Sequence, residues 1–289
     1  MKIKDVLNAH AQGVSFEFFP PKTANGLKAL GSTSALLAKY SPLYVSMTYG
    51  AGGSTQERTK EATYLLMQTK DLVVMPHLTS IGAHAQDVSG LLDEYKSRGI
   101  ENIMALRGDP PQGVSDFDFS KQEFRYAIDL VRFIKKYGHF CIGTAVYPEG
   151  HIENDSLEKD IDYTKMKIDA GADFAVTQMF FDNGHFYRML DRMKKRGVTV
   201  PVLPGILPLT DVGKVKQFCS VARTTVPAHI EQHMCKFADP ADMARAGLEY
   251  TIAQCQDLID HGFKRLHFFT LNKPEIITRV LDAIYARIR

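Results

Sequence analysis

The chain lacks most of the features that mark specialised protein classes. It contains no tryptophan and only four cysteines, Cys141, Cys219, Cys235 and Cys255, which are widely spaced and form no C-x-x-C pair. This pattern argues against a zinc ribbon or a disulfide framework and fits a reducing, cytoplasmic environment. No apolar run approaches the ~20 residues of a membrane span, and residues 1–13 lack the continuous apolar stretch of a signal peptide.

An excess of one charge is also absent. Lys and Arg number 35 against 33 Asp and Glu, a net charge of +2, which is too small for a broad surface that binds nucleic acid or an anionic membrane. A local basic cluster around one phosphorylated ligand stays compatible with this balance. The 289 residues are 45% hydrophobic and 24% charged, as in an ordinary folded protein. Because no Pro/Gly/Ser-rich linker divides them, residues 1–289 are expected to form a single domain.

What the chain does have is a regular alternation of strand-like and helix-like segments. Runs rich in β-branched and aromatic residues predict eight strands, at 14–20, 44–49, 73–79, 102–109, 141–148, 174–180, 201–207 and 265–271. Helical spacing lies between them, for example at 54–69, 87–98, 120–137, 155–170, 183–196 and 241–261, with an extra helix expected near 227–236. This order predicts a closed (β/α)₈ TIM barrel. An open doubly wound sheet is the alternative, because alternation alone does not distinguish the two.

Polar residues gather where these strands end. In a barrel the carboxyl ends of all strands meet on one face, which is where active sites form. Buried polar groups cost roughly 1–3 kcal/mol each when unpaired, so these side chains are expected to pair with one another, with water or with a ligand. They are Glu17, Thr48, Tyr49, His77, Thr79, Arg107, Gly108, Asp109, Tyr147, Glu149, Thr177, Gln178, Thr270 and Asn272.

Glu17 is the most informative member of this set. Its neighbours in F-E-F-F-P are phenylalanines, and a carboxyl group among aromatic rings has a raised pKa that suits proton donation. A solvated carboxylate without a role is the alternative. Other residues also have ordinary structural interpretations: a core histidine (His77), a tight turn with an internal ion pair (107–109), strand-end aromatics (Tyr49, Tyr147), a packing amide (Gln178) and a solvated lysine (Lys167).

Common cofactor and metal motifs are absent from the sequence. The glycine-rich segment 50–53 follows a strand, but Thr55 stands where G-x-G-x-x-G requires its third glycine. No P-loop spacing occurs. His229 and His233 lack the glutamate of H-E-x-x-H and a third ligand, so no metal site is predicted.

Eight sequence blocks, taken in order, carry a resemblance to a known family. They are SFEFFPP (15–21), VSMTYGA (45–51), PHLT (76–79), ALRGDPP (105–111), AVYPEGH (145–151), DAGADFAVTQMFFD (169–182), PGILP (204–208) and FFTLN (268–272). They strongly resemble methylenetetrahydrofolate reductase, in its short bacterial form with the catalytic domain only. The resemblance implies a barrel that binds FAD non-covalently and uses NADH or NADPH to convert 5,10-methylenetetrahydrofolate to 5-methyltetrahydrofolate. It also implies a ping-pong cycle, a homo-oligomer and a supply of methyl groups toward methionine.

The same resemblance assigns roles to individual residues. Glu17 matches the general acid that protonates N10 of the folate, and Asp109 matches an aspartate that faces both flavin and pterin. Arg107, His151 and Lys167 would meet the flavin diphosphate. Flavin-contacting positions fall on Thr48, Tyr49, Ala51, His77, Arg107, Gly108, Asp109, Tyr126, Ala127, Tyr147, His151, Asp160 and Lys167. Substrate-contacting positions fall on Thr48, Asp109, Gln178, Phe218 and Lys273.

The chain departs from the family pattern where arginine is expected, at Met166 and Lys273, and it has Phe269 and Lys214 where some members have tyrosine and glutamine. Two other classes of function stay open beside the reductase. One is a non-redox barrel, such as a pterin-binding methyltransferase or an inactive folate-binding protein, which would be colourless when purified. The other is an open-sheet dehydrogenase that binds NAD directly, which the failed glycine pattern disfavours.

Overall fold

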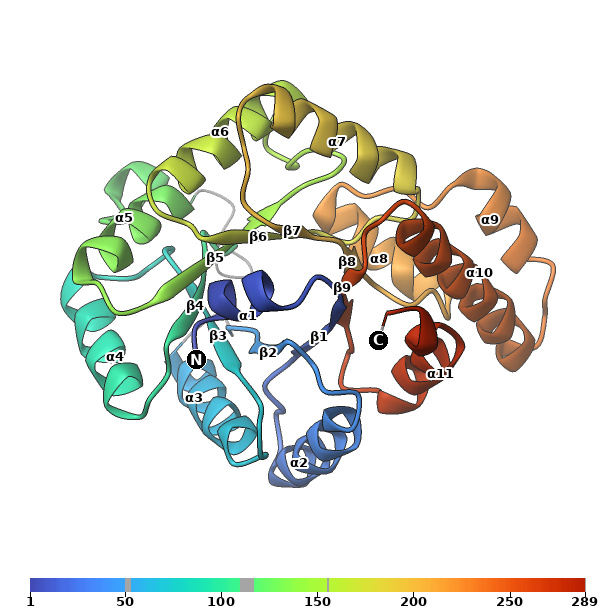
Figure 1. Cartoon of the computed structure of the whole chain (residues 1–289), viewed down its shortest axis with the longest axis horizontal. Coiled ribbons are helices and arrows are strands. Elements are labelled where there is room, and N and C mark those ends of the chain that lie inside the picture. Colours follow the sequence, from blue (N-terminus) through green and yellow to red (C-terminus); the bar gives the residue numbers. More distant parts are fainter. Residues whose placement is uncertain (50–52, 110–116, 155, 289) are drawn as a thin grey trace.

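The strands form one parallel sheet that curves into a ring (Figure 1). The computed structural model describes residues 1–49, 53–109, 117–154 and 156–288. The hydrogen-bonded order of the strands is β7-β6-β5-β4-β3-β2-β1-β9-β8. They are β1 (Gly13–Phe18), β2 (Tyr44–Met47), β3 (Val74–Thr79), β4 (Asn102–Leu106), β5 (Cys141–Val146), β6 (Phe174–Thr177), β7 (Val202–Leu203), β8 (Gly205–Ile206) and β9 (Arg265–Phe269).

The ring of strands is completed by a stretch that Pro204 divides into two short strands, β7 and β8. β7 pairs with β6 and β8 pairs with β9, and only Pro204 separates the two short strands. Proline has no N–H to donate to a sheet, so the predicted strand 201–207 is interrupted there, while the Pro204 carbonyl accepts from His267 N at 3.0 Å. The two pieces occupy one position of an eight-position ring. The α/β TIM barrel is therefore confirmed, and the open sheet is excluded.

The helices surround this ring, except for α1 (Figure 1). The predicted helix at 120–137 starts too early, because the described chain has only a 3₁₀ turn at Phe119–Lys121 before α5. The Asp129 carboxylate accepts from the N–H of Tyr126 at 2.9 Å and so marks the true start of α5. The helices are α1 (Ile3–Ala9), α2 (Ala24–Ala38), α3 (Gly53–Met67), α4 (Ala85–Ser97), α5 (Ala127–Tyr137), α6 (Leu157–Asp169), α7 (Asn183–Lys195), α8 (Val212–Ala222), α9 (Ala228–Met234), α10 (Pro240–Asp260) and α11 (Pro274–Ile284).

The short helix α1, which the sequence patterns did not predict, closes the amino end of the barrel. Its apolar residues Ile3, Val6 and Leu7 follow helical spacing and are buried. They pack against residues near the amino ends of the strands, including Tyr44 and Phe174. The view in Figure 1 shows α1 lying across the ring. The opposite end of the barrel, where the strands finish, is therefore the one left for a site.

Three helices lie between β8 and β9. The extra helix expected near 227–236 is present as α9, whereas α8 was not predicted. Both pack with the segment after β6 in one apolar cluster that contains Phe181, Val215 and Ile230. Residues 212–234, which comprise α8, α9 and the turn between them, form an arm beside the carboxyl ends of the strands.

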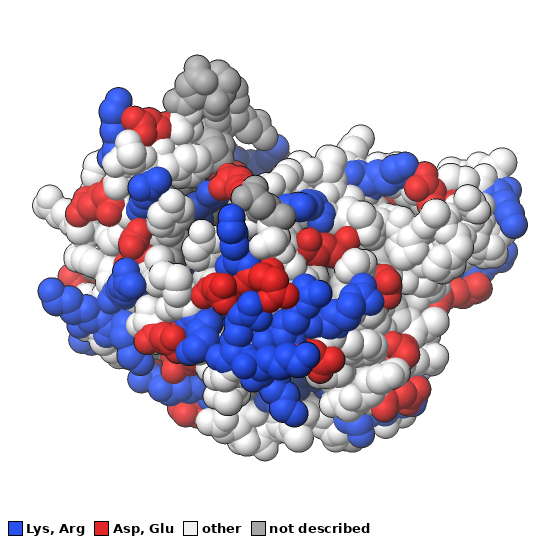
Figure 2. All heavy atoms as spheres, turned by 90° about the horizontal axis from the view of Figure 1, so that it is seen from above, with Lys and Arg blue, Asp and Glu red and all other residues white. Residues whose placement is uncertain are grey.

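Charged side chains alternate in sign over α6 and α7. Figure 2 shows a group of Lys and Arg side chains beside acidic ones on the face seen from above. Arg196 contacts Asp162 at 2.6 Å, and Arg192 contacts Glu158 at 3.3 Å. Exposed pairs of this kind contribute little to stability, about 0–1 kcal/mol each. In the part of the chain that the structure describes, no helix combines the length and apolar character needed to cross a bilayer.

Candidate active site

Glu17 points into the barrel from β1. Successive residues of a strand point to opposite faces, so Phe16 and Phe18 lie on the outer face, where they pack in the apolar layer with α2 and α11. Ser15 and Glu17 occupy the inner face. Glu17 is only 8% exposed, which places a carboxyl group inside the barrel near its carboxyl end.

Two imidazoles from distant strands face this carboxyl group. His77 Nε2 of β3 lies 3.4 Å from Glu17 Oε2, and His267 Nε2 of β9 lies 3.6 Å from the same oxygen. His77 is 6% exposed and His267 is fully buried. The predicted convergence of Glu17 and His77 is present in the structure, and His267 completes the group.

The predicted setting of Glu17 among phenyl rings with a raised pKa is wrong. Phe16 and Phe18 point away from it, and the groups that face it are basic. Burial by itself raises the pKa of the Glu17 carboxyl, but His77 and His267 more than offset this effect and lower it. Burial in turn lowers the pKa of His77. Glu17 is therefore one of three ionisable side chains that face one another, and not an isolated acid among apolar groups.

The residues after β9 hold the end of β1 in place. Thr270 Oγ1 donates to the Glu17 carbonyl at 2.6 Å. The Asn272 side chain accepts from the N–H of Phe19 at 3.0 Å and donates to its carbonyl at 2.8 Å. The backbone that carries Glu17 is thus fixed by polar side chains that the sequence placed correctly at the end of the last strand.

A second polar cluster joins the ends of β4 and β5 to the start of α6. Arg107 donates to the two carboxylate oxygens of Glu153, with one bond of 2.7 Å. The internal Arg107–Asp109 pair considered from the sequence is therefore replaced by a pair with Glu153. Asp160 is buried and accepts from the N–H of His151 and from the Asn154 side chain. These bonds fold residues 151–154 over the end of β5.

Lys167 turns its ammonium group inward instead of into solvent. Its Nζ donates to the Ala145 carbonyl at 2.5 Å. Burial lowers the pKa of Lys167 to about 8, with Asp160 opposing the shift. Burial likewise raises the pKa of the nearby Tyr147 phenol to about 12. A half-buried cation that faces inward and donates to a carbonyl oxygen is a suitable place for an anionic group of a ligand.

Gly108 allows the ends of β3 and β4 to approach closely. Its φ is +83°, and a Cβ atom there would lie 2.9 Å from Thr79 Cβ and 3.0 Å from Ile81 Cγ2. Both the backbone conformation and the space therefore require glycine. The next residue, Asp109, is exposed and makes no hydrogen bond with another described residue.

The remaining predicted flavin-contacting residues belong to segments near the carboxyl ends of the strands, which form the mouth of the barrel. Their side chains differ in solvent exposure. Tyr49 is half-buried, and burial raises its pKa to about 12. Thr48 follows β2, and its N–H donates to the Phe18 carbonyl at 2.9 Å. Tyr126 is 46% exposed at the start of α5, next to half-buried Ala127. Ala51 lies outside the described residues.

The predicted substrate-contacting residues lie on separate elements. Gln178 follows β6 and is half-buried, with its side-chain oxygen accepting from the N–H of Met179 at 2.9 Å. Phe218 is 43% exposed on α8, and Lys273 is exposed at the start of α11. Among the described residues, no hydrogen bond or ion pair joins any of these three to Glu17, so they surround the carboxyl end of the barrel without meeting one another.

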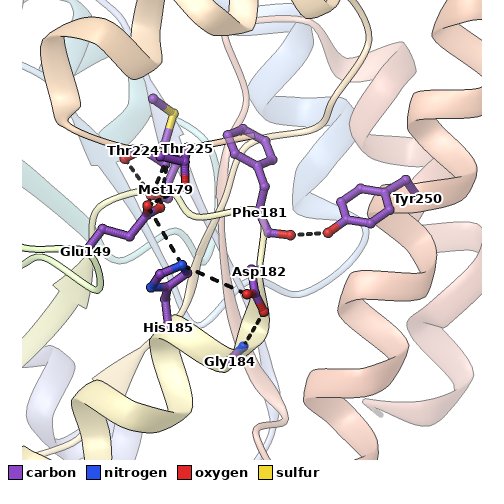
Figure 3. Close-up of polar contacts among 9 residues, drawn as sticks. All are labelled: Glu149, Met179, Phe181, Asp182, Gly184, His185, Thr224, Thr225 and Tyr250. Carbon is purple, nitrogen blue, oxygen red and sulfur yellow. Dashed lines mark hydrogen bonds and ion pairs between the residues drawn. The ribbon is translucent and has the colours of Figure 1, made fainter. Parts of the chain in front are cut away.

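Glu149, at the end of β5, fastens the arm that carries Phe218. Figure 3 shows its carboxylate pointing at the turn between α8 and α9, where it accepts from Thr225 N at 3.1 Å and from Thr225 Oγ1 at 2.6 Å. His185 of α7 lies 3.9 Å from the same carboxylate. Arg223 adds a bond of 3.1 Å to the His151 carbonyl. The flavin-side loop after β5 and the arm with Phe218 therefore form one connected structure.

His267 is the main residue that sequence reasoning missed. Its position in R-L-H-F-F-T-L drew no attention because a histidine within a strand has no distinctive pattern. The alternation of side chains along a strand could have indicated it. If the first and last strands pair in a closed barrel, Ser15 and Glu17 share the inner face with His267 and Phe269. Glu153 and Arg223 gave no signal, since both act through loops.

Comparison with known proteins decides the family. A family model described as methylenetetrahydrofolate reductase matches residues 2–285. The chain belongs to this family. It is 36% identical over 291 residues to the 5,10-methylenetetrahydrofolate reductase of Escherichia coli (strain K12), covering 98% of this chain and 96% of that protein.

Longer members of the family match as well. Methylenetetrahydrofolate reductase (NADH) 1 of Arabidopsis thaliana is 35% identical over 283 residues. The chain spans about half the length of such relatives, 48% for the Arabidopsis protein and 45% for methylenetetrahydrofolate reductase 1 of Schizosaccharomyces pombe. A solved structure of an uncharacterized Clostridium thermocellum protein, described as binding two copies of 5-methyl-5,6,7,8-tetrahydrofolic acid, has a TM-score of 0.63 over 98% of both chains. At 14% identity this similarity concerns the fold alone.

Proposed function

We propose that this chain reduces 5,10-methylenetetrahydrofolate to 5-methyltetrahydrofolate, using bound FAD and NADH or NADPH as the reductant. The observation that carries the proposal is the buried Glu17 carboxyl between two imidazoles, in a chain that matches the reductase family from residue 2 to 285. The net reaction consumes one hydride and one proton for each folate. A buried group that stores and delivers a proton is therefore what the chemistry requires.

The residues at the mouth fit FAD. The inward ammonium of Lys167, whose pKa is lowered to about 8, would gain an anionic partner from the diphosphate. His77 Nε2 is buried 3.4 Å from Glu17 Oε2 but has no hydrogen-bond partner among the described residues, so it can bond a polar ring atom. Arg107 fits only in part, because Glu153 engages it and would have to yield to a phosphate. When bound, FAD would take hydride from the nicotinamide and pass it to the methylene carbon of the folate.

Glu17 would act on the folate. Protonation of N10 makes that nitrogen a leaving group, the N10–methylene bond breaks, and the cation that remains on N5 accepts hydride. Because Glu17 is 8% exposed, it is the member of the buried group that both faces the mouth and contacts the two imidazoles. We assign it the role of general acid.

Four residues would hold the reactants. Asp109 is exposed at the end of β4 and would accept hydrogen bonds from the pterin. Gln178 and the exposed ring of Phe218 would meet the nicotinamide and the folate in turn, which corresponds to a ping-pong cycle. Lys273 would contact the folate tail as a point charge, where arginine would offer a two-pronged contact.

Spectroscopy tests the proposal directly. Purified protein is expected to be yellow, to bleach anaerobically with NADH or NADPH, and to regain its colour when 5,10-methylenetetrahydrofolate is added. Product analysis should find one 5-methyltetrahydrofolate for each reductant consumed, and the two initial rates identify the preferred nucleotide. A colourless protein that FAD does not reconstitute, but that binds folate, would refute the reductase and indicate a non-redox folate-binding barrel.

We further infer a cytoplasmic homo-oligomer that feeds methionine synthesis. The four cysteines are free, three of them buried, which fits a reducing compartment. Sedimentation equilibrium on the purified chain measures the oligomeric state. A monomer at all concentrations would contradict the inference about assembly without affecting the proposed chemistry.

A further inference from the structure

A chain of polar side chains runs from Glu17 down into the closed part of the barrel. His267 Nε2 faces Glu17 Oε2 at 3.6 Å. The other nitrogen of the same imidazole, His267 Nδ1, lies 2.8 Å from Ser15 Oγ and 3.4 Å from the Tyr44 hydroxyl. Ser15, Tyr44 and His267 are all 0% exposed. The imidazole also stacks on the Tyr44 ring, with 5.7 Å between centroids, so its orientation is fixed.

This burial separates His267 from any ligand. Glu17 is the member of the chain that reaches the mouth, and His77, on the other side of Glu17, is also slightly exposed. A serine, a histidine and an acid in line resemble a hydrolytic triad, but Ser15 Oγ cannot meet a substrate because the residue is completely enclosed. The arrangement therefore serves Glu17 and not a separate reaction.

We propose that His267 is a positioning residue that holds the reserve proton for Glu17. This inference rests on the proposed function, in which Glu17 protonates the folate. In the charged imidazole, Nδ1–H donates to Ser15 Oγ and Nε2–H faces Glu17. Transfer of the Nε2 proton to Glu17 Oε2 leaves a neutral ring whose Nδ1–H bond to Ser15 is unchanged. Only a proton is transferred and the ring keeps its orientation, while Nε2 and Oε2 close from 3.6 Å to hydrogen-bonding distance.

The charges around the pair explain why a second base is useful. Two other titratable groups face the Glu17–His267 pair. His77 of β3 faces Glu17, Tyr44 of β2 faces His267, and neither is an anion at neutral pH. A single carboxyl group holds its proton only at pH values below its own pKa. A carboxylate beside an imidazole retains one proton between them to higher pH, because the negative charge of Glu17 stabilises the imidazolium. Glu17, which is 8% exposed whereas His267 is fully enclosed, would take up the next proton from the open end of the barrel.

The experiment compares His267→Gln with wild-type holoenzyme. Glutamine keeps polar atoms near Glu17 but cannot carry the proton. We expect reduction by NADH to stay within about twofold, while the alkaline limb of the folate half-reaction moves by about one pH unit toward acid. That shift lowers the folate rate about tenfold on the alkaline side. In infrared spectra near neutral pH, the protonated-carboxyl band that is absent from E17Q should strengthen in H267Q, because His267 no longer competes with Glu17 for the proton.

Two further variants keep the test decisive. Ser15→Ala removes the partner of Nδ1 and should produce the same shifts at smaller size, even if H267Q folds poorly. Thr144→Val alters another buried hydroxyl, on β5, and should change nothing. An unchanged pH limb and carboxyl band in both H267Q and S15A would overturn the inference. If wild-type protein itself shows no folate-dependent flavin oxidation, the proposed function fails, and the carboxyl band still tests the shared proton.

Discussion

At the scale of single residues, the environment of each buried charge decides what it can do. Glu17 and Lys167 both carry ionisable groups into the barrel wall. Glu17 meets two imidazoles, and their effect on its pKa outweighs that of burial, so the pKa is lowered. Lys167 meets mainly a carbonyl oxygen, so its charge is poorly balanced and its pKa falls to about 8. The first arrangement suits proton transfer, and the second suits anion binding.

Replacing Glu17 with glutamine should separate the two half-reactions. The amide cannot donate a proton to N10, so folate reduction should fall by a factor of about 10²–10⁴. Flavin reduction by NADH needs no such donor and should remain within about twofold of wild type. Stopped-flow absorbance measures both steps, with Glu61→Gln on the exposed face of α3 as the control. Equal loss in both half-reactions would show that Glu17 has another role.

Replacing Lys167 with methionine should change how stability depends on pH in protein freed of nucleotide. The folded-state pKa is about 8 against 10.5, so between these values the unfolded chain binds more protons than the folded one. Wild type should therefore gain stability relative to K167M as pH rises from 7 toward 10.5, by about 1–3 kcal/mol. Urea unfolding at several pH values measures this difference. A constant difference would mean that the ammonium group is solvated.

At the scale of elements, the loop after β5 joins two parts of the mouth. Asp160 of α6 fixes residues 151–154 from one side. Glu149 and Arg223 connect the same loop to the turn between α8 and α9 on the other. Because Phe218 is carried by α8, the position of this ring depends on bonds made at the flavin side of the site.

Thr225→Val tests how much this connection contributes. The hydroxyl donates to Glu149 Oε2 at 2.6 Å, and hydrogen bonds to charged groups contribute about 1.5–3 kcal/mol. We expect T225V to lower the free energy of unfolding by about 1–2 kcal/mol. Thr278→Val serves as the matched control, because its hydroxyl donates to the Glu275 carbonyl within the same helix, α11, in an exposed bond. Equal melting temperatures for the two variants would show that the arm is held by apolar packing alone.

At the scale of the whole molecule, stability and chemistry occupy opposite ends of the barrel. The floor consists of α1 packed on Tyr44, Met75 and Phe174, while the ionisable groups assigned to the reaction lie toward the other end. Such a division is general for barrels of this kind. It predicts that damage at the floor affects folding without changing the chemistry.

Leu7→Ala at the floor should destabilise the protein without changing its kinetics. Leu7 is 2% exposed, and truncation of a buried leucine costs about 2–5 kcal/mol. Calorimetry should show a melting temperature lower by several degrees, with kcat and KM unchanged at temperatures where the variant is folded. Leu36→Ala, at a residue that is 38% exposed on α2, should have a much smaller effect. A large kinetic defect in L7A would indicate that floor and mouth are coupled.

The periodic features of the chain were predictable from sequence. The eight predicted strands and most of the helices depend on local spacing, and they are present within a few residues. Where a helix begins depends on one capping bond, as between Tyr126 and Asp129, so the start of α5 was misjudged. The helix α1 escaped notice because seven residues give too short a pattern until a floor exists for them to cover.

The sequence by itself determined that polar groups would meet at the strand ends, and it carried the blocks that identify the family. Only the tertiary structure decided which groups touch. His267 lies 252 positions from Ser15 along the chain yet 2.8 Å from its hydroxyl, and Arg107 pairs with Glu153 rather than Asp109. Alternation within a strand shows which residues share a face, whereas the charge that each one meets comes from strands and loops elsewhere. For that reason the basic neighbours of Glu17, which come from β3 and β9, could be identified only from the folded barrel.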